Sequence, residues 1–288
     1  MLIKTDIEIR PLQTVDEYRA AEQLQRDVWN LEDVEVVPDH LLITAQKNGG
    51  TVLGAFDVTA EGERLIGSVF GFVGLTPDGK VKHCSHMAGV APEYQSRSVG
   101  YRLKLAQREH VLSQGMDLIT WTFDPLESRN ARLNFRKLGV TCRTYLRNLY
   151  GSMRDQLNAG LFSDRFQVEW HITSDHVVDR LRGDWVGDSL SVLLAEGVPV
   201  LNRALLDDDH LFHPPQKKTL SIEGDRLLIQ IPARFQAVKT ADFELARAWR
   251  EHTRALFEAA FADEYTVVDL LFEEGQSYYL LRKDWMAL

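Results

Sequence analysis

Residues 88–110 read AGVAPEYQSRSVGYRLKLAQREH, and they decide the fold. An apolar run that ends at Val90 predicts a short strand, and Pro92 closes it because proline has no N–H to donate. From Ser98 the apolar residues recur at helical spacing. The expected inner face carries Val99, Leu103, Ala106 and His110, and the expected outer face carries Arg102, Lys104, Arg108 and Glu109. A strand therefore leads through a short loop into a helix.

This junction offers several backbone donors to an anion. The first N–H groups of a helix have no partner inside the helix, and they stand at the positive end of its dipole. A loop that opens directly into a helix therefore suits a phosphate group. An ordinary strand–turn–helix junction would show the same pattern.

The loop Gln95-Ser96-Arg97-Ser98-Val99-Gly100 resembles the Gln/Arg-x-x-Gly-x-Gly/Ala loop of the GNAT superfamily of acyl-CoA-dependent N-acyltransferases. In that family the loop amides wrap the pyrophosphate of coenzyme A, and the preceding strand runs beside the pantetheine arm. The first glycine of the motif is Ser98 here. Its Cβ restricts the backbone, but its N–H remains and its hydroxyl could add a donor, so we expect weakened or adjusted binding rather than loss.

A second segment, SRNARLNFRKLGV (128–140), resembles the Asn-x-x-Ala-x-x-x-Tyr-x-Lys-x-Gly-Phe helix of the same family. Phe135 stands where many members carry the tyrosine that protonates the coenzyme A thiolate, so that role is vacant or passes to Tyr101, Asn134 or a water. The resemblance implies contacts with coenzyme A or acyl-CoA at Ala88, Val90, Gln95, Ser96, Arg97, Ser98, Val99, Gly100, Tyr101, Ser128, Asn130 and Phe135.

Residues 1–150 are expected to form a first domain, in the order strand, helix, helix, hairpin, strand, helix, strand, helix, strand. This is the element order of the GNAT fold, an α/β (α+β) fold with a central mixed sheet. The segments concerned are a strand up to Pro11, a helix over Val15–Trp29, a short helix after Pro38, a hairpin from Thr51–Val58 and Leu65–Leu75, the strand and helix of 88–110, a strand over Leu118–Phe123, a helix over Ser128–Leu138 and a strand over Arg143–Tyr150.

Residues 151–288 are expected to form a C-terminal domain. Residues 202–219 contain an acidic run and Pro214-Pro215, which is typical of a linker or a long surface loop. Residues 227–236 (LLIQIPARFQ) then echo GVAPEYQ. A helical face with Leu245, Trp249, Leu256 and Ala260 follows, and strands are expected at Thr266–Phe272 and Tyr278–Leu281. We interpret this pattern as a degenerate GNAT-like half that lacks the phosphate loop and does not bind coenzyme A.

The composition narrows the partners. The net charge of -9 and the absence of a long Lys/Arg block argue against nucleic acid. The N-terminus MLIKTDIEIR is too polar for a signal peptide, and no apolar run approaches a membrane span, so we expect a cytoplasmic protein without a membrane partner. Cys84 and Cys142 lack metal-ligand spacing, and no metal is expected. A homodimer is left open.

His86 is the expected general base. In the GNAT family a backbone N–H of the strand before the loop holds the acyl carbonyl, which here would lie around Ala88 to Val90. The arylalkylamine branch of the family also carries a histidine four residues before the position of Val90. Strict alternation would place Cys84, His86, Ala88 and Val90 on one face, with His83 and Ser85 on the other. A neutral imidazole can take the proton of the acceptor amine. The alternative is a core histidine bonded to a backbone carbonyl.

Four residues are candidates for the amine site. The resemblance places Trp29 and His40 in the region that covers the acceptor end of the strands, and Trp121 and Asp124 lie along and after the strand that follows the cofactor helix. Asp124 beside an aromatic wall could pair with an ammonium group, although a turn-forming aspartate among core aromatics is the alternative.

Two functions follow from this reading. The first is an N-acyltransferase that moves an acyl group, acetyl or succinyl, from coenzyme A to the amine of a small molecule such as an amino acid. The chain also resembles a prokaryotic branch associated with N-acylamino acid metabolism. The second is a non-catalytic module that binds or senses acyl-CoA, which Ser98 in place of glycine and Phe135 in place of tyrosine favour.

Overall fold

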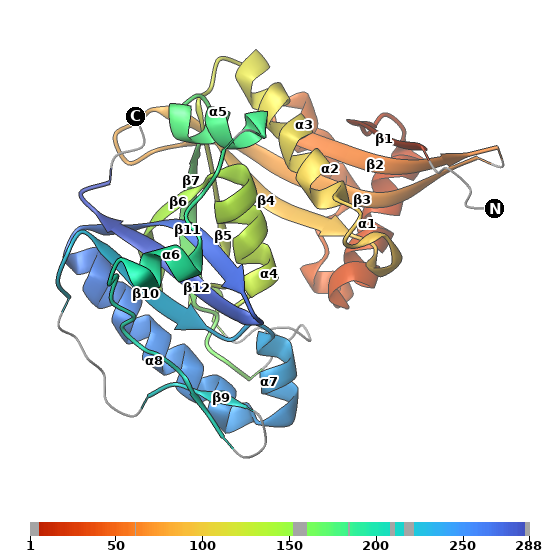
Figure 1. Ribbon diagram of the computed structural model, residues 1–288. Coiled ribbons are helices and arrows are strands. Elements are labelled where there is room, and N and C mark those ends of the chain that lie inside the picture. Colours follow the sequence, from red (N-terminus) through yellow and green to blue (C-terminus); the bar gives the residue numbers. More distant parts are fainter. Residues whose placement is uncertain are drawn as a thin grey trace. The chain divides into compact units, whose positions relative to one another are not determined.

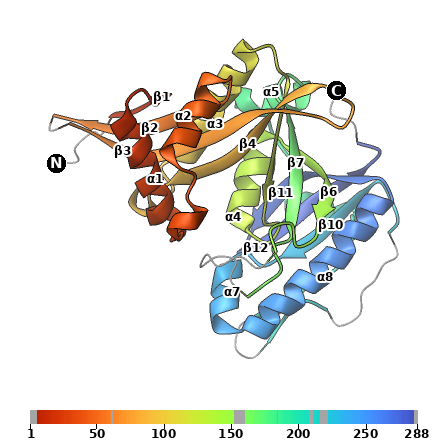
Figure 2. The ribbon, with the colours of Figure 1, turned by 180° about the vertical axis from the view of Figure 1, so that it is seen from behind.

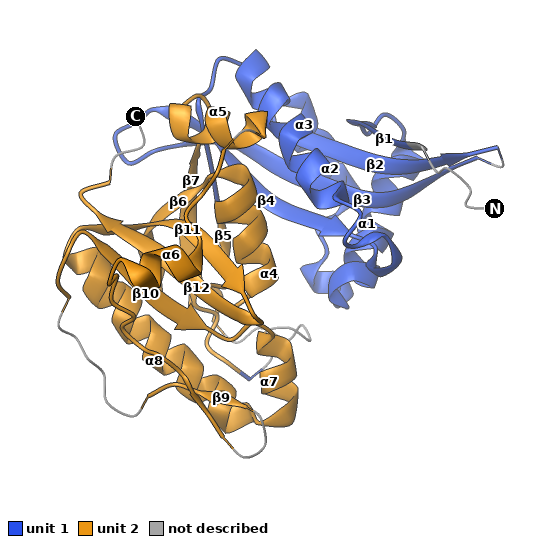
Figure 3. Ribbon diagram, viewed as in Figure 1, with its two compact units in different colours: residues 1–121, 153–160 blue, residues 122–152, 161–288 orange. Residues whose placement is uncertain are grey.

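The computed structural model describes residues 6–60, 62–151, 160–183, 185–207, 211–215 and 222–285. The chain forms two compact units (Figure 3), one of Met1–Trp121 with Met153–Gly160 and one of Thr122–Ser152 with Leu161–Leu288. The division falls inside a strand and does not coincide with the expected domain boundary after residue 150, which remains a prediction. No helix in these described ranges is long and apolar enough to cross a membrane.

The first unit is built on a mixed sheet (Figure 1). Its strands lie in the order β1 (Asp6–Pro11), β2 (Thr51–Thr59), β3 (Gly62–Leu75), β4 (Val81–Val90) and β5 (Leu118–Phe123). The strands β1 to β4 pair antiparallel, whereas β4 and β5 are parallel and pair at His83–Ile119 and Cys84–Thr120. The mixed sheet expected from the sequence is confirmed.

Helices cover both faces of this sheet. The helix α3 (Val99–Ser113) packs Val99 and Leu103 on one face, and α1 (Val15–Trp29) and α2 (Asp39–Lys47) pack on the other (Figures 1 and 2). The first helix begins at Val15 because Thr14 and Glu17 form a capping box, an arrangement worth about 1 kcal/mol. Short 3₁₀ turns lie at Asp33–Glu35 and Pro92–Tyr94.

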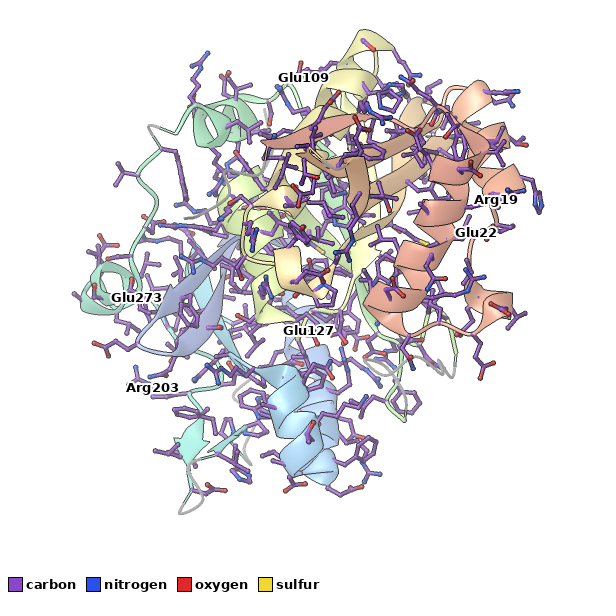
Figure 4. All side chains as sticks on the ribbon, turned by 90° about the vertical axis from the view of Figure 1, so that its right-hand side faces the viewer. Arg19, Glu22, Glu109, Glu127, Arg203 and Glu273 are labelled. Atoms are coloured by element: carbon purple, nitrogen blue, oxygen red, sulfur yellow. The ribbon has the colours of Figure 1, made fainter. Side chains whose placement is uncertain are left out.

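The first two helices are also joined directly. Arg19 and Glu22 project from α1 (Figure 4), and the Glu22 carboxylate accepts a hydrogen bond of 2.5 Å from the backbone N–H of Asp39, the first residue of α2. A carboxylate at a helix N-terminus is stabilised by the helix dipole. This contact fixes the start of α2 on the face of the sheet where the acceptor site is expected.

The second unit contains an antiparallel sheet of order β7-β6-β11-β12-β10. Its strands are β6 (Thr141–Leu146), β7 (Arg165–His171), β10 (Arg226–Ile231), β11 (Tyr265–Glu273) and β12 (Gln276–Lys283), with a separate hairpin of β8 (Leu205–Leu206) and β9 (Phe212–His213). Its helices are α4 (Ser128–Ala131), which continues as a π-helical segment (Arg132–Leu138), α5 (Asp175–Arg182), α6 (Leu190–Ala195), α7 (Phe235–Ala241) and α8 (Phe243–Ala262).

A helix–strand–strand pattern occurs twice in this unit. The helical segment from Ser128 to Leu138 leads into β6 and β7, and α8 leads into β11 and β12. The two patterns meet where β6 pairs antiparallel with β11, at Cys142–Val267. The second unit therefore contains a helix, a strand and a returning strand twice. The second occurrence has the order of elements expected for residues 243–281.

Most expected elements are confirmed, but α5, α6 and α7 were not predicted, and further differences occur. The helix expected over Ser128–Leu138 widens into π-helical turns from Arg132, and the strand expected over Arg143–Tyr150 is β6, Thr141–Leu146. The strand β7 was not predicted, although its buried Phe166, Val168 and Trp170 alternate as in a half-buried strand. The expected linker 202–219 contains the hairpin β8–β9, and its residues 208–210 and 216–219 lie outside the described residues.

Candidate active site

Two serines in the loop between β4 and α3 adopt a left-handed backbone. Ser96 has φ 70° and Ser98 has φ 61°, a region that costs an ordinary L-residue roughly 1–2 kcal/mol and glycine nothing. Ser98 is also the N-cap of α3. The loop therefore keeps, with a serine, a backbone conformation that a glycine adopts readily.

The N-terminus of α3 is left without a side-chain cap. The Ser98 side chain accepts no hydrogen bond from the first turn, and that turn contains no acidic residue. Residues 95–98 are exposed, while Val99 is buried and anchors the start of the helix. The first turn thus carries no carboxylate and receives no bond from the N-cap side chain, a condition that favours the binding of an anion at a helix end.

Contacts inside the first unit hold this loop in place. The Tyr94 hydroxyl donates a hydrogen bond to the buried carboxylate of Asp57 in β2. The Arg97 guanidinium lies 4.9 Å from the centre of the Tyr94 ring. The Gln95 amide donates to the carbonyl of Val90 at 3.3 Å. Hydrogen bonds thus join the loop to β2 and to β4.

The strand β4 has a bulge at His86. Met87 lies opposite Phe70 and Ser85 lies opposite Gly71, so two neighbouring residues of β3 face three of β4. A bulge adds one residue to a strand and shifts the alternation of the side chains that follow.

The expected assignment of faces is therefore wrong beyond the bulge. Cys84 and His86 lie on the face covered by α1 and α2. Cys84 pairs with Phe72, and the His86 ring contacts the Phe70 ring on that face. Ala88 and Val90 lie on the face covered by α3. There Val90 packs on the cluster that contains Val99 and Leu103. Strict alternation had placed all four residues on one face.

His86 stands among aromatic rings. Its ring centre lies 5.8 Å from that of Phe70, edge-on, and 6.1 Å from that of Phe72. Within the described residues neither ring nitrogen has a hydrogen-bond partner, and the side chain remains accessible. Loss of solvent around the ring lowers its pKa below the usual 6.5. The imidazole is therefore mostly neutral at pH 7 and able to accept a proton.

A hollow adjoins His86 on the same face of the sheet. Trp29 lines it, together with Gln25, Ser68, Phe70 and Met87. The Trp29 ring packs on the backbone of Gly89, where a Cβ would come within 2.7 Å of the indole. His40 is the other residue of this region that is expected at the acceptor site. Its side chain is 81% exposed, and its Nδ1 lies 3.8 Å from Oδ1 of Asp39.

On the opposite face, α3 buries a lysine that was expected on its outer side. The Lys104 ammonium lies 3.8 Å from the centre of the Trp121 ring and donates to the Ser85 hydroxyl at 2.7 Å. Helix spacing did not predict the burial of Lys104, because the side chains of Leu103 and Lys104 both face inward. Trp121, expected at the amine site, therefore lies against this lysine.

Asp124 lies in the second unit and is already paired. Both of its carboxylate oxygens accept from Arg250 of α8, one of them at 2.8 Å, and the Leu126 N–H donates to it as well. Burial raises the pKa of this carboxyl, but Arg250 outweighs that effect and the pKa is lowered overall. An ammonium substrate would have to compete with a buried arginine for this group.

The remaining expected cofactor contacts also belong to the second unit. Phe135 is fully buried, with its ring centre 5.5 Å from that of Tyr279 and 6.5 Å from that of Phe166. Ser128 is buried and bonded to Ser277 at 2.6 Å, while Asn130 is exposed. The nearby Glu127 (Figure 4) has its pKa raised by burial and accepts a hydrogen bond from Gln236.

Metal ligands do not cluster in the described part of the chain, where no group of three or more His, Cys, Asp or Glu side chains is suitably placed. The two cysteines are free. Cys142 is buried, and burial raises the pKa of its thiol.

No family model and no curated protein matches the sequence. Solved structures similar to this chain include the NatC complex bound to Gag peptide and coenzyme A (13% identity, 58% of this chain, 99% of that chain, TM-score 0.47). Arabidopsis thaliana NAA60 with a bisubstrate analogue matches at 16% identity over 58% of this chain and 100% of that chain, with a TM-score of 0.46. The putative acetyltransferase yncA of Salmonella typhimurium, with acetyl-CoA, matches at 16% identity over 58% of this chain and 94% of that chain, with a TM-score of 0.45. At these identities and TM-scores the similarities do not establish an activity for this chain.

Proposed function

We propose that this protein is an N-acyltransferase that moves an acyl group, acetyl or succinyl, from coenzyme A to the amine of a small molecule such as an amino acid. One observation carries the proposal. A single strand, β4, ends in an exposed loop with an uncapped helix N-terminus and also carries an accessible, neutral histidine at a bulge. An anion-binding loop and a proton acceptor on one strand are what acyl transfer from coenzyme A requires.

The donor would lie on the loop side of β4. The N–H groups from Ser98 to Tyr101 would bind the pyrophosphate, as the resemblance implies. The pairing of β4 with β5 ends at Cys84–Thr120 in the described residues, so the edge of β4 from Ser85 to Val90 is available to the pantetheine arm and to the acyl carbonyl. Ala88, exposed on the α3 face, is placed to lie along that arm.

The acceptor would arrive at the α1 and α2 face. There His86 would remove a proton from the amine before or during attack on the thioester, with the substituent of the amine on the side of Trp29. A backbone N–H of β4 would stabilise the oxyanion. Phe135 has no hydroxyl to protonate the thiolate, so that proton would come from water or from another side chain.

Thiol release measures the proposed reaction directly. Acetyl-CoA and succinyl-CoA are each incubated with the full chain and a panel of D- and L-amino acids and simple amines. We expect free thiol to appear at a rate that depends on the acceptor. Tight binding of acyl-CoA without thiol release from any pair would instead favour the non-catalytic binding module.

His86→Ala tests the assigned base. We expect turnover to fall by about 10²–10⁴-fold with acyl-CoA affinity nearly unchanged, because the ring lies on the face of α1 and α2, opposite the face covered by α3. Since the pKa of His86 is lowered, the native rate should fall on the acid side with a midpoint below 6.5, and this limb should be lost in the variant. His171→Ala, which removes a half-exposed histidine of the second unit, is the control. Loss of cofactor binding together with activity would make His86 structural.

A further inference from the structure

A buried polar network joins α3 to β4 before the bulge. The Lys104 ammonium of α3 donates to the Ser85 hydroxyl at 2.7 Å and to the side-chain oxygen of Gln107 at 3.2 Å. Since that oxygen accepts from the lysine, the NH₂ group of Gln107 donates to Nε2 of His83, 3.2 Å away. All four residues are at most 5% exposed. The contact between α3 and this part of β4 is therefore polar.

Beyond the bulge the contact between the same two elements is apolar. Val90, the last residue of β4, packs on the cluster that contains Val99 and Leu103 of α3. Ser85 and Val90 thus both face α3, although they are five positions apart in the sequence. In a regular strand, residues separated by an odd number of positions lie on opposite faces. The two contacts with α3 are compatible only because β4 contains an extra residue between them.

The extra residue is His86. Met87 lies opposite Phe70 and Ser85 lies opposite Gly71, so the pairing of β4 with β3 skips the histidine. The His86 ring contacts the ring of Phe70, the partner of Met87, so these two neighbouring residues both face α1 and α2. A bulge changes the direction of the side chain that it contains. His86 therefore owes its place on the face of α1 and α2 to the bulge.

A regular pairing of β4 with β3 would orient His86 differently. If the residues up to His86 slipped by one position, this residue would lie opposite Gly71, and Ser85 would lie opposite Phe72. A slip of one residue moves every side chain concerned to the other face of the sheet. His86 would then face α3, and Ser85 would lose its contact with Lys104. The two registers thus place the candidate base on opposite faces.

We propose that Lys104 and Ser85 are positioning residues, which fix the bulge in β4 and thereby hold His86 on the face of α1 and α2. The inference rests on the proposed function for the role of His86 as the base. A buried polar pair opposes a change of register because both groups would lose their partner, whereas apolar side chains pack in more than one register. Neither residue needs to touch the substrate, because both act through His86.

The contact does not depend on the charge of Lys104. Burial lowers the pKa of this lysine to about 7, but a neutral amine keeps N–H donors for the Ser85 hydroxyl. The pKa of His83 is lowered to about 4 by burial and by the charges of Lys104 and His110, so its ring stays neutral near pH 7. The network therefore persists on both sides of neutral pH, and we expect the acid limb of the pH–rate profile to report on His86.

Ser85→Ala and Lys104→Met each remove one side of the contact. Turnover of each variant should fall by about ten- to a hundredfold, because a small displacement of a base slows proton transfer. Acyl-CoA affinity should keep the native value, since the loop lies beyond the bulge. The double variant should fall no further than the more severe single variant, because the two residues form one contact. Multiplied effects in the double variant would overturn the inference. Lys80→Met, which removes an exposed lysine paired with Asp78, is the control with native turnover.

The ring of His86 provides a second readout that needs neither substrate nor turnover. Its resonances in the isotope-labelled full chain are assigned by their loss in His86→Ala, and they report the Phe70 ring 5.8 Å away. In Ser85→Ala, which removes a single oxygen, these resonances should move and their titration midpoint should change. Native resonances with an unchanged midpoint in this variant would overturn the inference. Moved resonances in the variant, together with no thiol release by the native chain, would support the positioning role and contradict the proposed function.

Discussion

Two junctions between a strand and a helix carry similar sequence, and they end differently. In the first unit β4 leads through residues 91–98 into α3, and in the second unit β10 leads through Pro232 into α7 and then α8. The echo between GVAPEYQ and LLIQIPARFQ predicts a degenerate GNAT-like half. In the structure the echo extends to a strand that leads into a helix, but not to the loop between them.

The junction of the second unit lacks the loop that precedes α3. Within residues 232–234 no residue has a positive φ, and Phe235 is buried at the start of α7. The seven-residue α7 has no side-chain cap and no acid in its first turn, as is also true of α3. The cap belongs to the next helix, α8, where the Asp242 carboxylate accepts a hydrogen bond from the N–H of Leu245, 2.9 Å away, and Glu244 adds a second negative charge to the first turn.

The junction of the first unit has a longer, exposed loop. Ser98 caps α3 without using its side chain, and the first turn carries no acid. The left-handed backbone at Ser96 and Ser98 shows that the loop conformation is maintained against a conformational cost. The loop, rather than the absence of a cap alone, separates the candidate anion site from the second junction, and the following changes act on this loop and on the capped helix α8.

Ser98→Asp should have the largest effect, because it places a carboxylate at the N-terminus of α3, as Asp242 does at the N-terminus of α8. Aspartate tolerates the left-handed region, so the fold should persist. Repulsion between this carboxylate and a pyrophosphate should weaken acyl-CoA binding by about a hundredfold or more, measured by calorimetry. Ser98→Asn, which has the same shape without the charge, is the matched control. Equal affinity of both variants would place the pyrophosphate elsewhere.

Asp242→Ala should have an intermediate effect, on stability alone. Loss of the cap of α8 should lower the free energy of unfolding by about 0.5–2 kcal/mol, measured by denaturant titration. Acyl-CoA affinity should stay at the native value, because this junction does not bind the cofactor. A gain or loss of affinity in this variant would show that the second junction takes part in binding.

Ser98→Gly should have the smallest effect. Removal of the Cβ relieves the left-handed backbone but adds freedom to the unfolded chain, so we expect a gain of between zero and about 1 kcal/mol in stability. Acyl-CoA affinity should hold or improve. Ser98→Val, with a β-branched side chain at the same φ, should lose both stability and affinity. Identical behaviour of the serine, glycine and valine forms would mean that the loop conformation plays no part.

The sequence predicted the elements that depend on local patterns. The spacing in Val15–Trp29 and the apolar run in Leu118–Phe123 matched α1 and β5 to the residue. Helix spacing also placed Leu245, Trp249, Leu256 and Ala260 correctly on one buried face of α8. These outcomes follow from contacts between near neighbours, which periodicity reports well.

Features set by distant contacts escaped prediction. The bulge at His86 arises from the register of β4 against β3, and no local signal in HCSHMAGV marks it. Lys104 looks like a surface lysine until Trp121 and Ser85 are brought to it by the sheet. Asp124 looks like a free carboxylate until Arg250, 126 residues later, pairs with it. In each case the partner lies too far along the chain for spacing to reveal.

We expect the cofactor to bind at the loop between β4 and α3. This can be measured by titration of the isotope-labelled full chain with coenzyme A, followed through backbone amide shifts. The largest shifts should occur at residues 95–101, with smaller ones along Ser85 to Val90 and little change at residues 232–245. Shifts concentrated at residues 232–245, with the first junction unmoved, would contradict this expectation.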